Sequence, residues 1–212
     1  HMLAPDYSSA THGIAHSRWS SAVGWQATGH LSLPGNSADF YVTGASSDSN
    51  SNIHVIYIVP LNSGYDRYYA RSQAGVWLPP VELPAWDEYG YRQEMALAVD
   101  VRGVPHVFLG VQQSELDGVT GWLYHMRLDG VALTPPQRIT REGNDWQNLS
   151  PLADFDAENR LHVLWVGTPP GGGTSLHHSV ASFGSSSDTS PPSIGSIPQN
   201  VHPARESARW NV

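Results

Sequence analysis

The sequence predicts an all-β protein built from β-propeller blades, each with four antiparallel strands. Two observations predict this fold: a composition rich in turn formers and aromatic residues, and an internal repeat. The 212-residue chain has 20 Gly, 16 Pro, 8 Trp, 9 Tyr and 4 Phe, and only 14% of its residues are charged. Many turns and aromatic residues with few charged helix formers are typical of short β-strands.

The composition also excludes several classes of function. All 11 basic residues are arginine, so the chain lacks the lysine that a Walker A loop or Schiff-base chemistry requires. It has no cysteine, which excludes thiol nucleophiles, cysteine-ligated zinc and disulfides. A net charge of −8 argues against a nucleic-acid partner. No apolar run is long enough to span a membrane.

The repeat consists of an aspartate followed six residues later by His-Val and an apolar run. The three copies extend from Asp48 to His54, from Asp100 to His106 and from Asp156 to His162. Turn-forming residues divide the middle copy into strands expected at 95–99, 106–111, 122–128 and 137–140. A repeat of about 50 residues with four strands is the signature of a propeller blade.

The repeats predict about three and a half blades within residues 1–183. A half blade at 11–33 supplies the last two strands of a blade. Two full blades follow at 36–84 and 85–140, and a third blade at 141–183 lacks its last strand. We interpret His1-Met2 as an expression remnant and exclude it from the fold. Residues 184–212 are rich in Ser and Pro and are expected to form an extended tail.

The pattern Asp-x-x-Gly-x-x-His-Val, which opens the second strand at 100–107, resembles the sialidase-type (BNR-like) β-propeller repeat of bacterial secreted proteins. The resemblance covers residues 11–183 and implies a secreted or cell-surface location. Residues 91–97 also resemble the Tyr-Arg-Ile-Pro-Ala-Leu motif of sialidases, which implies that Arg92 binds a carboxylate. Gln93 and Glu94 depart from that motif, and the Asp-box-like stretch at 114–122 has a different spacing. Propellers host unrelated activities, so the resemblance specifies the fold rather than the function.

The repeated aspartates and histidines are expected to be structural. The aspartates should cap turns by accepting hydrogen bonds from backbone amides, and the histidines should bond to neighbouring turns. One copy, with Asp48, Asn50 and Asn52, has the alternating oxygens of a calcium loop as an alternative. The acidic residue expected further on is missing there, and no other cofactor or metal is predicted.

The candidate ligand-binding residues lie in long loops predicted to share one face of the blades. These loops connect the second strand to the third, or one blade to the next, and loops on a rigid scaffold are where binding sites are found. The candidates are Tyr65, Asp66, Arg67, Trp86, Tyr89, Tyr91, Arg92, Asp117, Asp145 and Trp146.

Aromatic rings beside planar polar groups suit carbohydrate, because sugar faces stack on rings while hydroxyls form hydrogen bonds. The same residues suit a protein interface, and Trp86 and Trp146 have burial at a blade junction as an alternative. We therefore predict a non-catalytic recognition or assembly module that binds glycan or protein. The alternative is part of a sialidase-like glycoside hydrolase that shares its catalytic residues with other blades.

Three and a half blades cannot surround an axis, because closed propellers use four to eight. We predict a homodimer of about six or seven blades, with the half blade at 11–33 at the seam. The alternative is completion by missing blades on another chain. The tail is expected to pair as the missing outer strand or to reach across to the partner.

Overall fold

The computed structural model describes residues 1–6, 12–33, 40–61, 64–83, 92–115, 118–129, 132–140, 147–168 and 173–182. All regular elements in these residues are strands. None of the described residues forms a helix with the length and apolar character needed to cross a membrane. The fold is therefore all-β, as the sequence predicts.

The strands form four antiparallel sheets in chain order. The first sheet contains β1 (Met2–Asp6), β2 (Gly13–Ser20) and β3 (Gly24–Ser32). The second contains β4 (Tyr41–Ser47), β5 (Ile53–Leu61), β6 (Gly64–Gln73), β7 (Val76–Trp77) and β8 (Val81–Glu82). The third contains β9 (Arg92–Val99), β10 (Pro105–Glu115), β11 (Gly118–Asp129), β12 (Ala132–Leu133) and β13 (Gln137–Arg138). The last contains β14 (Gln147–Phe155), β15 (Arg160–Thr168) and β16 (Ser175–Ser182).

The third sheet has the four strands expected for the middle repeat, as β9, β10, β11 and β13. The short strand β12 is an addition. The first sheet differs from the expectation, because β1 pairs with β2 along its whole length from Met2↔Ser17 to Asp6↔Gly13. It therefore has three strands rather than two, and Met2, excluded from the sequence-based fold, belongs to it. Leu3 packs against the neighbouring hydrophobic core and anchors this strand. The tail at 184–212 lies outside the described residues.

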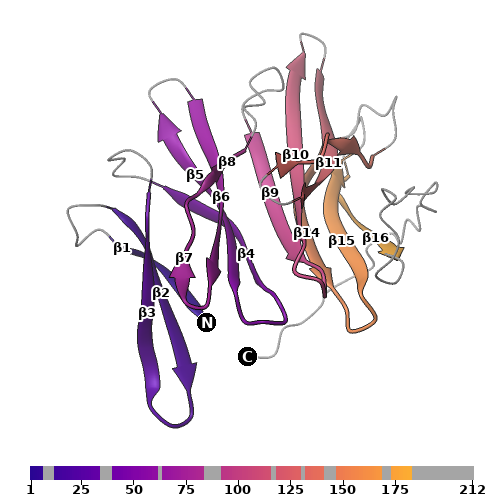
Figure 1. Ribbon diagram of the computed structural model, residues 1–212. Coiled ribbons are helices and arrows are strands. Elements are labelled where there is room, and N and C mark those ends of the chain that lie inside the picture. The colour runs from indigo at the N-terminus through magenta and orange to yellow at the C-terminus, as the bar shows by residue number, and fades with distance from the viewer. Residues whose placement is uncertain are drawn as a thin grey trace.

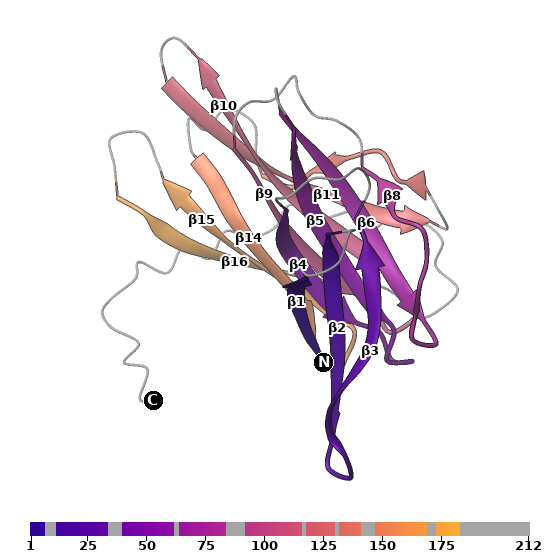
Figure 2. The ribbon, with the colours of Figure 1, turned by 90° about the vertical axis from the view of Figure 1, so that its left-hand side faces the viewer.

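The four sheets lie side by side, from the first at the left of Figure 1 to the last at the right. The face that a sheet turns toward the next sheet along the chain is here called its forward face, and the opposite one its rear face. Three hydrophobic clusters fill the three junctions between neighbouring sheets. The described sheets form an open row, in which the first and last stand at opposite ends (Figures 1 and 2).

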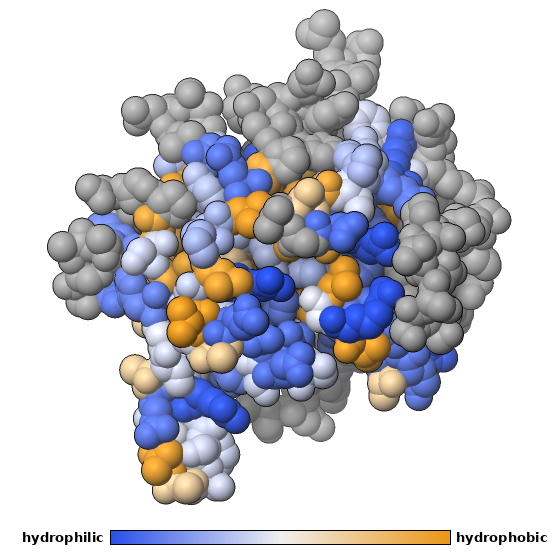
Figure 3. Space-filling model, viewed as in Figure 1, coloured by the Kyte–Doolittle hydropathy of each residue, from blue (hydrophilic) through white to orange (hydrophobic). Residues whose placement is uncertain are grey.

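The loops that connect the strands lie along two opposite edges of the row, above and below the sheets in Figure 1. The β5–β6 and β10–β11 hairpins lie together at the top of Figure 1, here called the hairpin end. The β4–β5, β9–β10 and β14–β15 turns lie at the bottom, here called the turn end, and the β2–β3 hairpin projects there as well (Figures 1 to 3). The β5–β6 and β10–β11 hairpins, which connect second strands to third strands, thus lie opposite the turns that connect first strands to second strands. The connections between sheets at 34–39, 84–91 and 141–146 lie outside the described residues.

Candidate functional site

At the turn end, the three repeated aspartates form the same arrangement of hydrogen bonds. In each copy, one carboxylate oxygen (Oδ1) accepts hydrogen bonds from the backbone amides two and four residues later. For Asp100, the donors are the amides of Arg102 and Val104, each at 2.9 Å. The same bonds form at Asp48, at 2.9 and 2.8 Å, and at Asp156, at 3.0 and 2.8 Å. The prediction that these aspartates cap turns is confirmed.

The third residue after each aspartate adopts a positive φ, which the turn requires. These residues are Ser51 at 63°, Gly103 at 79° and Asn159 at 58°. Small residues and asparagine tolerate this left-handed region best. That requirement explains why the repeat keeps a small or turn-forming residue at this place.

Each repeated histidine links its turn to the third strand of the same sheet. The His106 Nδ1 atom lies 2.9 Å from Nε2 of His125, and its Nε2 lies 4.0 Å from Oδ2 of Asp100. His162 lies likewise between His178, at 3.0 Å, and Asp156, at 2.9 Å. His54 lies between the Tyr69 hydroxyl, at 2.7 Å, and Asp48, at 3.6 Å. We call each set an Asp–His unit.

The three units are dispersed along the row, one per sheet. The described residues contain no group of three or more His, Asp or Glu side chains that could hold a metal ion. At the calcium candidate, Asp48 directs one carboxylate oxygen at two backbone amides and the other at the Asn52 side chain, at 2.8 Å. These bonds are those of an Asn/Asp-rich turn capped by its aspartate, the main expectation for this loop, to which calcium was the alternative.

Burial differs sharply among the units. Burial lowers the pKa of His106 to about 2 and that of His125 to about 4, with nearby charged groups adding to the effect. In the last sheet, the His162–His178 pair is exposed, and Asp156 has a lowered pKa because His162 and Arg160 hydrogen bond to its carboxylate, which outweighs desolvation.

The hairpin end of the second sheet brings two exposed tyrosines to the forward face. Tyr41 on β4 pairs with Ile58 on β5, and Ile58 pairs with Arg67 on β6. Residues directly opposite each other in antiparallel strands share a face, and Tyr65 lies two residues before Arg67 on that same face. Tyr41 and Tyr65 are 58% and 46% exposed, whereas Arg67 is only 5% exposed. The Arg67 guanidinium donates a hydrogen bond to the Tyr65 carbonyl, at 3.3 Å.

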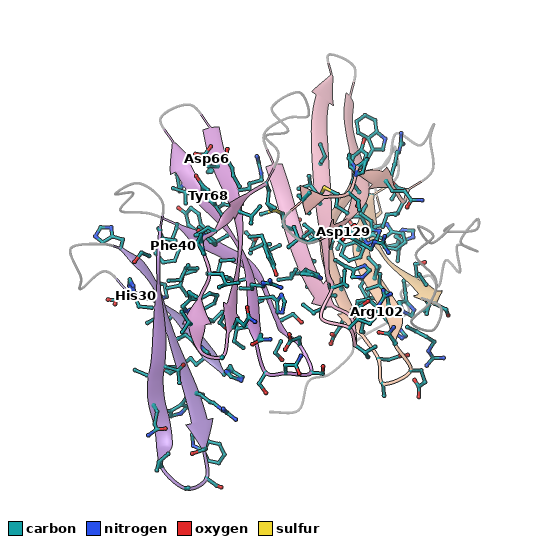
Figure 4. All side chains as sticks on the ribbon, viewed as in Figure 1. His30, Phe40, Asp66, Tyr68, Arg102 and Asp129 are labelled. Carbon is teal, nitrogen blue, oxygen red and sulfur yellow. The ribbon has the colours of Figure 1, made fainter. Side chains whose placement is uncertain are left out.

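Asp66 lies on the rear face of the same strand, away from Tyr65 and Arg67. Its Oδ2 accepts a hydrogen bond of 3.4 Å from the Tyr68 hydroxyl, and Tyr68 stacks on Tyr57. Figure 4 shows Asp66 and Tyr68 near the hairpin end of the second sheet. Burial and the nearby Asp66 carboxylate raise the pKa of Tyr68. The structure therefore brings Tyr65 and Arg67 together and separates Asp66 from them.

The other candidate ligand residues stay predictions. Trp86, Tyr89, Tyr91, Asp117, Asp145 and Trp146 lie outside the described residues. Arg92 begins β9 and pairs with Gln112, but its side chain is not among those described.

Two features were missed by the sequence interpretation. Tyr41 was not among the candidates because it precedes the repeat motif, and only strand pairing through Ile58 of β5 places it on the same face as Arg67. Trp19 and Trp25 pair across the projecting β2–β3 hairpin and are each 55% exposed. Their spacing around the turn-forming residues 20–24 was the available sequence signal.

No protein-family model and no curated protein sequence matches the chain. Among solved structures, it is similar to a Hadza microbial sialidase (TM-score 0.53, 12% identity, 82% of this chain and 43% of that one). It is also similar to an endo-arabinase from Bacteroides thetaiotaomicron (TM-score 0.54, 13% identity, 96% of this chain and 76% of that one). A third similar structure is a protein of unknown function from Dyadobacter fermentans (TM-score 0.52, 10% identity, 82% of this chain and 56% of that one).

The chain thus spans less than half the length of the sialidase and about three quarters of the endo-arabinase. At these identities the likeness concerns the fold alone. The neighbours have propeller-type folds, in agreement with the fold class that the repeat predicts.

Proposed function

We propose that the chain is a non-catalytic module that recognises glycans at the hairpin end of its sheets. The observation that carries the proposal is the pair of exposed tyrosines, Tyr41 on β4 and Tyr65 on β6, which lie on one face of the second sheet on either side of β5. Tyrosine rings stack on the apolar faces of sugars, and their hydroxyls donate and accept hydrogen bonds. A location outside the cell, where such ligands are presented, belongs to the same proposal.

A protein ligand is less well supported, because Asp66 lies on the face opposite to Tyr65 and Arg67. Part of the function lies in the loops at 84–91 and 141–146, whose aromatic and acidic residues remain candidate contacts. The proposal therefore makes Tyr65 the residue to test first, since its exposed ring and position are both described.

The test is binding of the purified chain to an immobilised glycan array that includes sialylated and arabinose-containing oligosaccharides. Tyr65→Ala is expected to lower affinity for the bound glycans at least tenfold without changing the melting temperature, because its ring is exposed. Trp25→Ala is the matched control, since Trp25 is an equally exposed aromatic residue at the turn end. Binding that survives Tyr65→Ala, or that Trp25→Ala abolishes, contradicts the proposal.

The alternative is that the chain forms part of a sialidase-like glycoside hydrolase. The observation in its favour is that β9, the first strand of the third sheet, begins at Arg92 and carries Glu94, whose Oε2 is enclosed without a hydrogen-bond partner among the described residues. Hydrolysis of glycosides normally needs a pair of positioned carboxylates, and Glu94 is a single one. Turnover of a fluorogenic sialoside or arabinoside that Arg92→Ala abolishes would favour this alternative.

The same proposal includes assembly. Three junctions hold the row together, while one face of the first sheet and one face of the last have no described sheet against them. We propose that a homodimer or a chain with the missing blades covers such a face.

A further inference from the structure

Two tyrosines and two carboxylates gather on the rear face of the second sheet, on the side away from Tyr65. Tyr57 of β5 lies directly opposite Tyr68 of β6, and Glu82 of β8 lies opposite Tyr68 on its other side, so the three share one face. Asp66 shares it too, two residues before Tyr68, and its Oδ2 accepts a hydrogen bond of 3.4 Å from the Tyr68 hydroxyl (Figure 4). We call these four residues the tyrosine–carboxylate cluster.

The two tyrosine hydroxyls of the cluster lie close to each other. The rings stack with their centroids 5.4 Å apart and their planes at 21°, so the two side chains extend in the same direction from opposite positions. Burial and the neighbouring Tyr68 raise the pKa of Tyr57. Burial, Asp66 and Glu82 raise the pKa of Tyr68. The Tyr57 hydroxyl therefore points toward the group that the two carboxylates surround.

The Tyr57 hydroxyl is buried and forms no hydrogen bond with the described residues. The Tyr57 side chain is fully buried, and its oxygen is enclosed without a partner. The buried Tyr69, on the forward face of the same sheet, shows the usual situation, because its hydroxyl bonds to Nδ1 of His54 at 2.7 Å. A buried polar atom without a partner is rare in proteins and indicates that a further group binds there.

The charge of the cluster is negative and is not balanced within the described part of the chain. No ion pair among the described residues involves Asp66 or Glu82. The chain has no lysine, and residues 19–66, which include β3, β4 and β5, contain no arginine. Arg67 lies on the opposite, forward face of the sheet. A ligand of this cluster is therefore expected to be a cation.

We propose that the tyrosine–carboxylate cluster binds a protonated primary amine. An ammonium group has three N–H donors and no acceptor, and the cluster offers acceptors on Asp66, Glu82 and the Tyr57 hydroxyl. The tyrosine rings also attract a cation through their faces. A metal ion fits less well, because the described residues contain no group of three His, Asp or Glu side chains that could hold one. The site lies on the face opposite to Tyr65 and does not depend on the proposed glycan site.

The amine can belong to an amino sugar or to a simple alkylamine, and a titration followed by NMR distinguishes the two. The probes are glucosamine, its uncharged counterpart N-acetylglucosamine, and n-butylamine, all at pH 6.5. Glucosamine is expected to bind at least tenfold more tightly than N-acetylglucosamine. Equal binding of n-butylamine supports a site for any primary amine, and much weaker binding supports a site for amino sugars. The proposal is overturned if N-acetylglucosamine binds as tightly as glucosamine, or if neither amine binds.

A first pair of variants tests the carboxylates. Glu82→Gln is expected to weaken glucosamine binding at least tenfold, because it removes one of two negative charges from the cluster. Glu158→Gln is the matched control, since Glu158 is also exposed but lies in the last sheet, and it is expected to leave binding unchanged. Equal binding by Glu82→Gln and the wild-type chain would place the amine elsewhere and overturn the proposal.

A second pair of variants tests the buried hydroxyl. Tyr57→Phe is expected to weaken glucosamine binding severalfold without lowering the melting temperature of the free chain, because the lost hydroxyl has no partner there. Tyr69→Phe is the matched control and is expected to do the opposite, because it breaks the bond to His54 and lies on the other face. A Tyr57→Phe chain that melts earlier, or that binds glucosamine like the wild-type chain, contradicts the role of this hydroxyl and overturns the proposal.

Discussion

The third and last sheets carry the same Asp–His unit in opposite environments. In the third sheet, Asp100, His106 and His125 are buried under the last sheet, and Phe155 of β14 packs edge-on against His106. In the last sheet, the equivalent Asp156, His162 and His178 are open to solvent. The capping bonds and the pairing of the two histidines are nearly identical, so the local sequence builds the unit, whereas the histidine Nε2 lies 4.0 Å from the carboxylate in the third sheet and 2.9 Å from it in the last. The burial of the unit depends on whether another sheet follows.

The largest difference in the free energy of unfolding is expected when the apolar residue beside each unit is truncated. Phe108→Ala should lower the free energy of unfolding by roughly 3–5 kcal/mol, because a buried ring leaves a cavity. Leu164→Ala, the equivalent change in the last sheet, should cost about 1 kcal/mol, since Leu164 is only half-buried. Chemical denaturation at a concentration where the chain is monomeric measures both. Equal losses would show that the last sheet is covered within a single copy.

The next largest effect is the loss of stability that acid should cause through the buried unit of the third sheet. His106 and His125 have pKa values of about 2 and 4, below the ordinary value of 6.5. The unfolded chain therefore takes up protons first as the pH falls below 6.5, and the folded state is destabilised by about 1.4 kcal/mol per pH unit for each histidine. This loss continues until the folded-state pKa is reached, and no such effect operates above pH 7.

The measurement is the free energy of unfolding at pH 6.5 and 4.5. His106→Gln should reduce the difference between the two values by roughly 3 kcal/mol. A steep acid loss that persists in His106→Gln would show that other groups cause it.

Removing the capping carboxylate should have an intermediate effect. Asp100→Ala leaves the partly buried amides of Arg102 and Val104 without their acceptor, at a cost of roughly 1–3 kcal/mol. Asp156→Ala should destabilise the chain less, because water replaces the carboxylate at that turn. Thermal unfolding of the two variants side by side gives the comparison, and a larger shift for Asp156→Ala would reverse it.

The smallest change in stability is expected when the positive-φ residue of each turn is substituted. Gly103→Ala should cost about 1 kcal/mol, because a side chain in the left-handed region is strained and its Cβ would lie 3.4 Å from the Asp48 carboxylate. Asn159→Gly should change stability by less than about 0.5 kcal/mol, since relief of strain offsets the lost hydrogen bond between its side chain and the Val101 amide. Melting temperatures test both, and a neutral Gly103→Ala would contradict the strain argument.

Much of the fold followed from the sequence alone. The spacing from Asp48 to His54, repeated twice, predicted the turns, the capping bonds and the second strands, because all of these are interactions within one sheet. The expectation that the histidines are structural was right for the same reason. The strand β1 was missed, because His1-Met2 was set aside as a remnant although Met2 pairs with Ser17.

Only the tertiary structure decided how the candidate site is divided. Neighbouring residues on a strand point to opposite faces, so Asp66 is separated from Tyr65 and Arg67, although the three are consecutive in the sequence. Tyr41 joins Tyr65 only through pairing across β5. Burial is likewise a property of the row and not of a repeat: Phe108 and Leu164 occupy equivalent places, but a sheet packs over Phe108 and none of the described residues packs a sheet over Leu164. Short-range bonding can therefore be inferred from spacing, whereas exposure, and the binding surfaces that depend on it, is set by which sheets stand side by side.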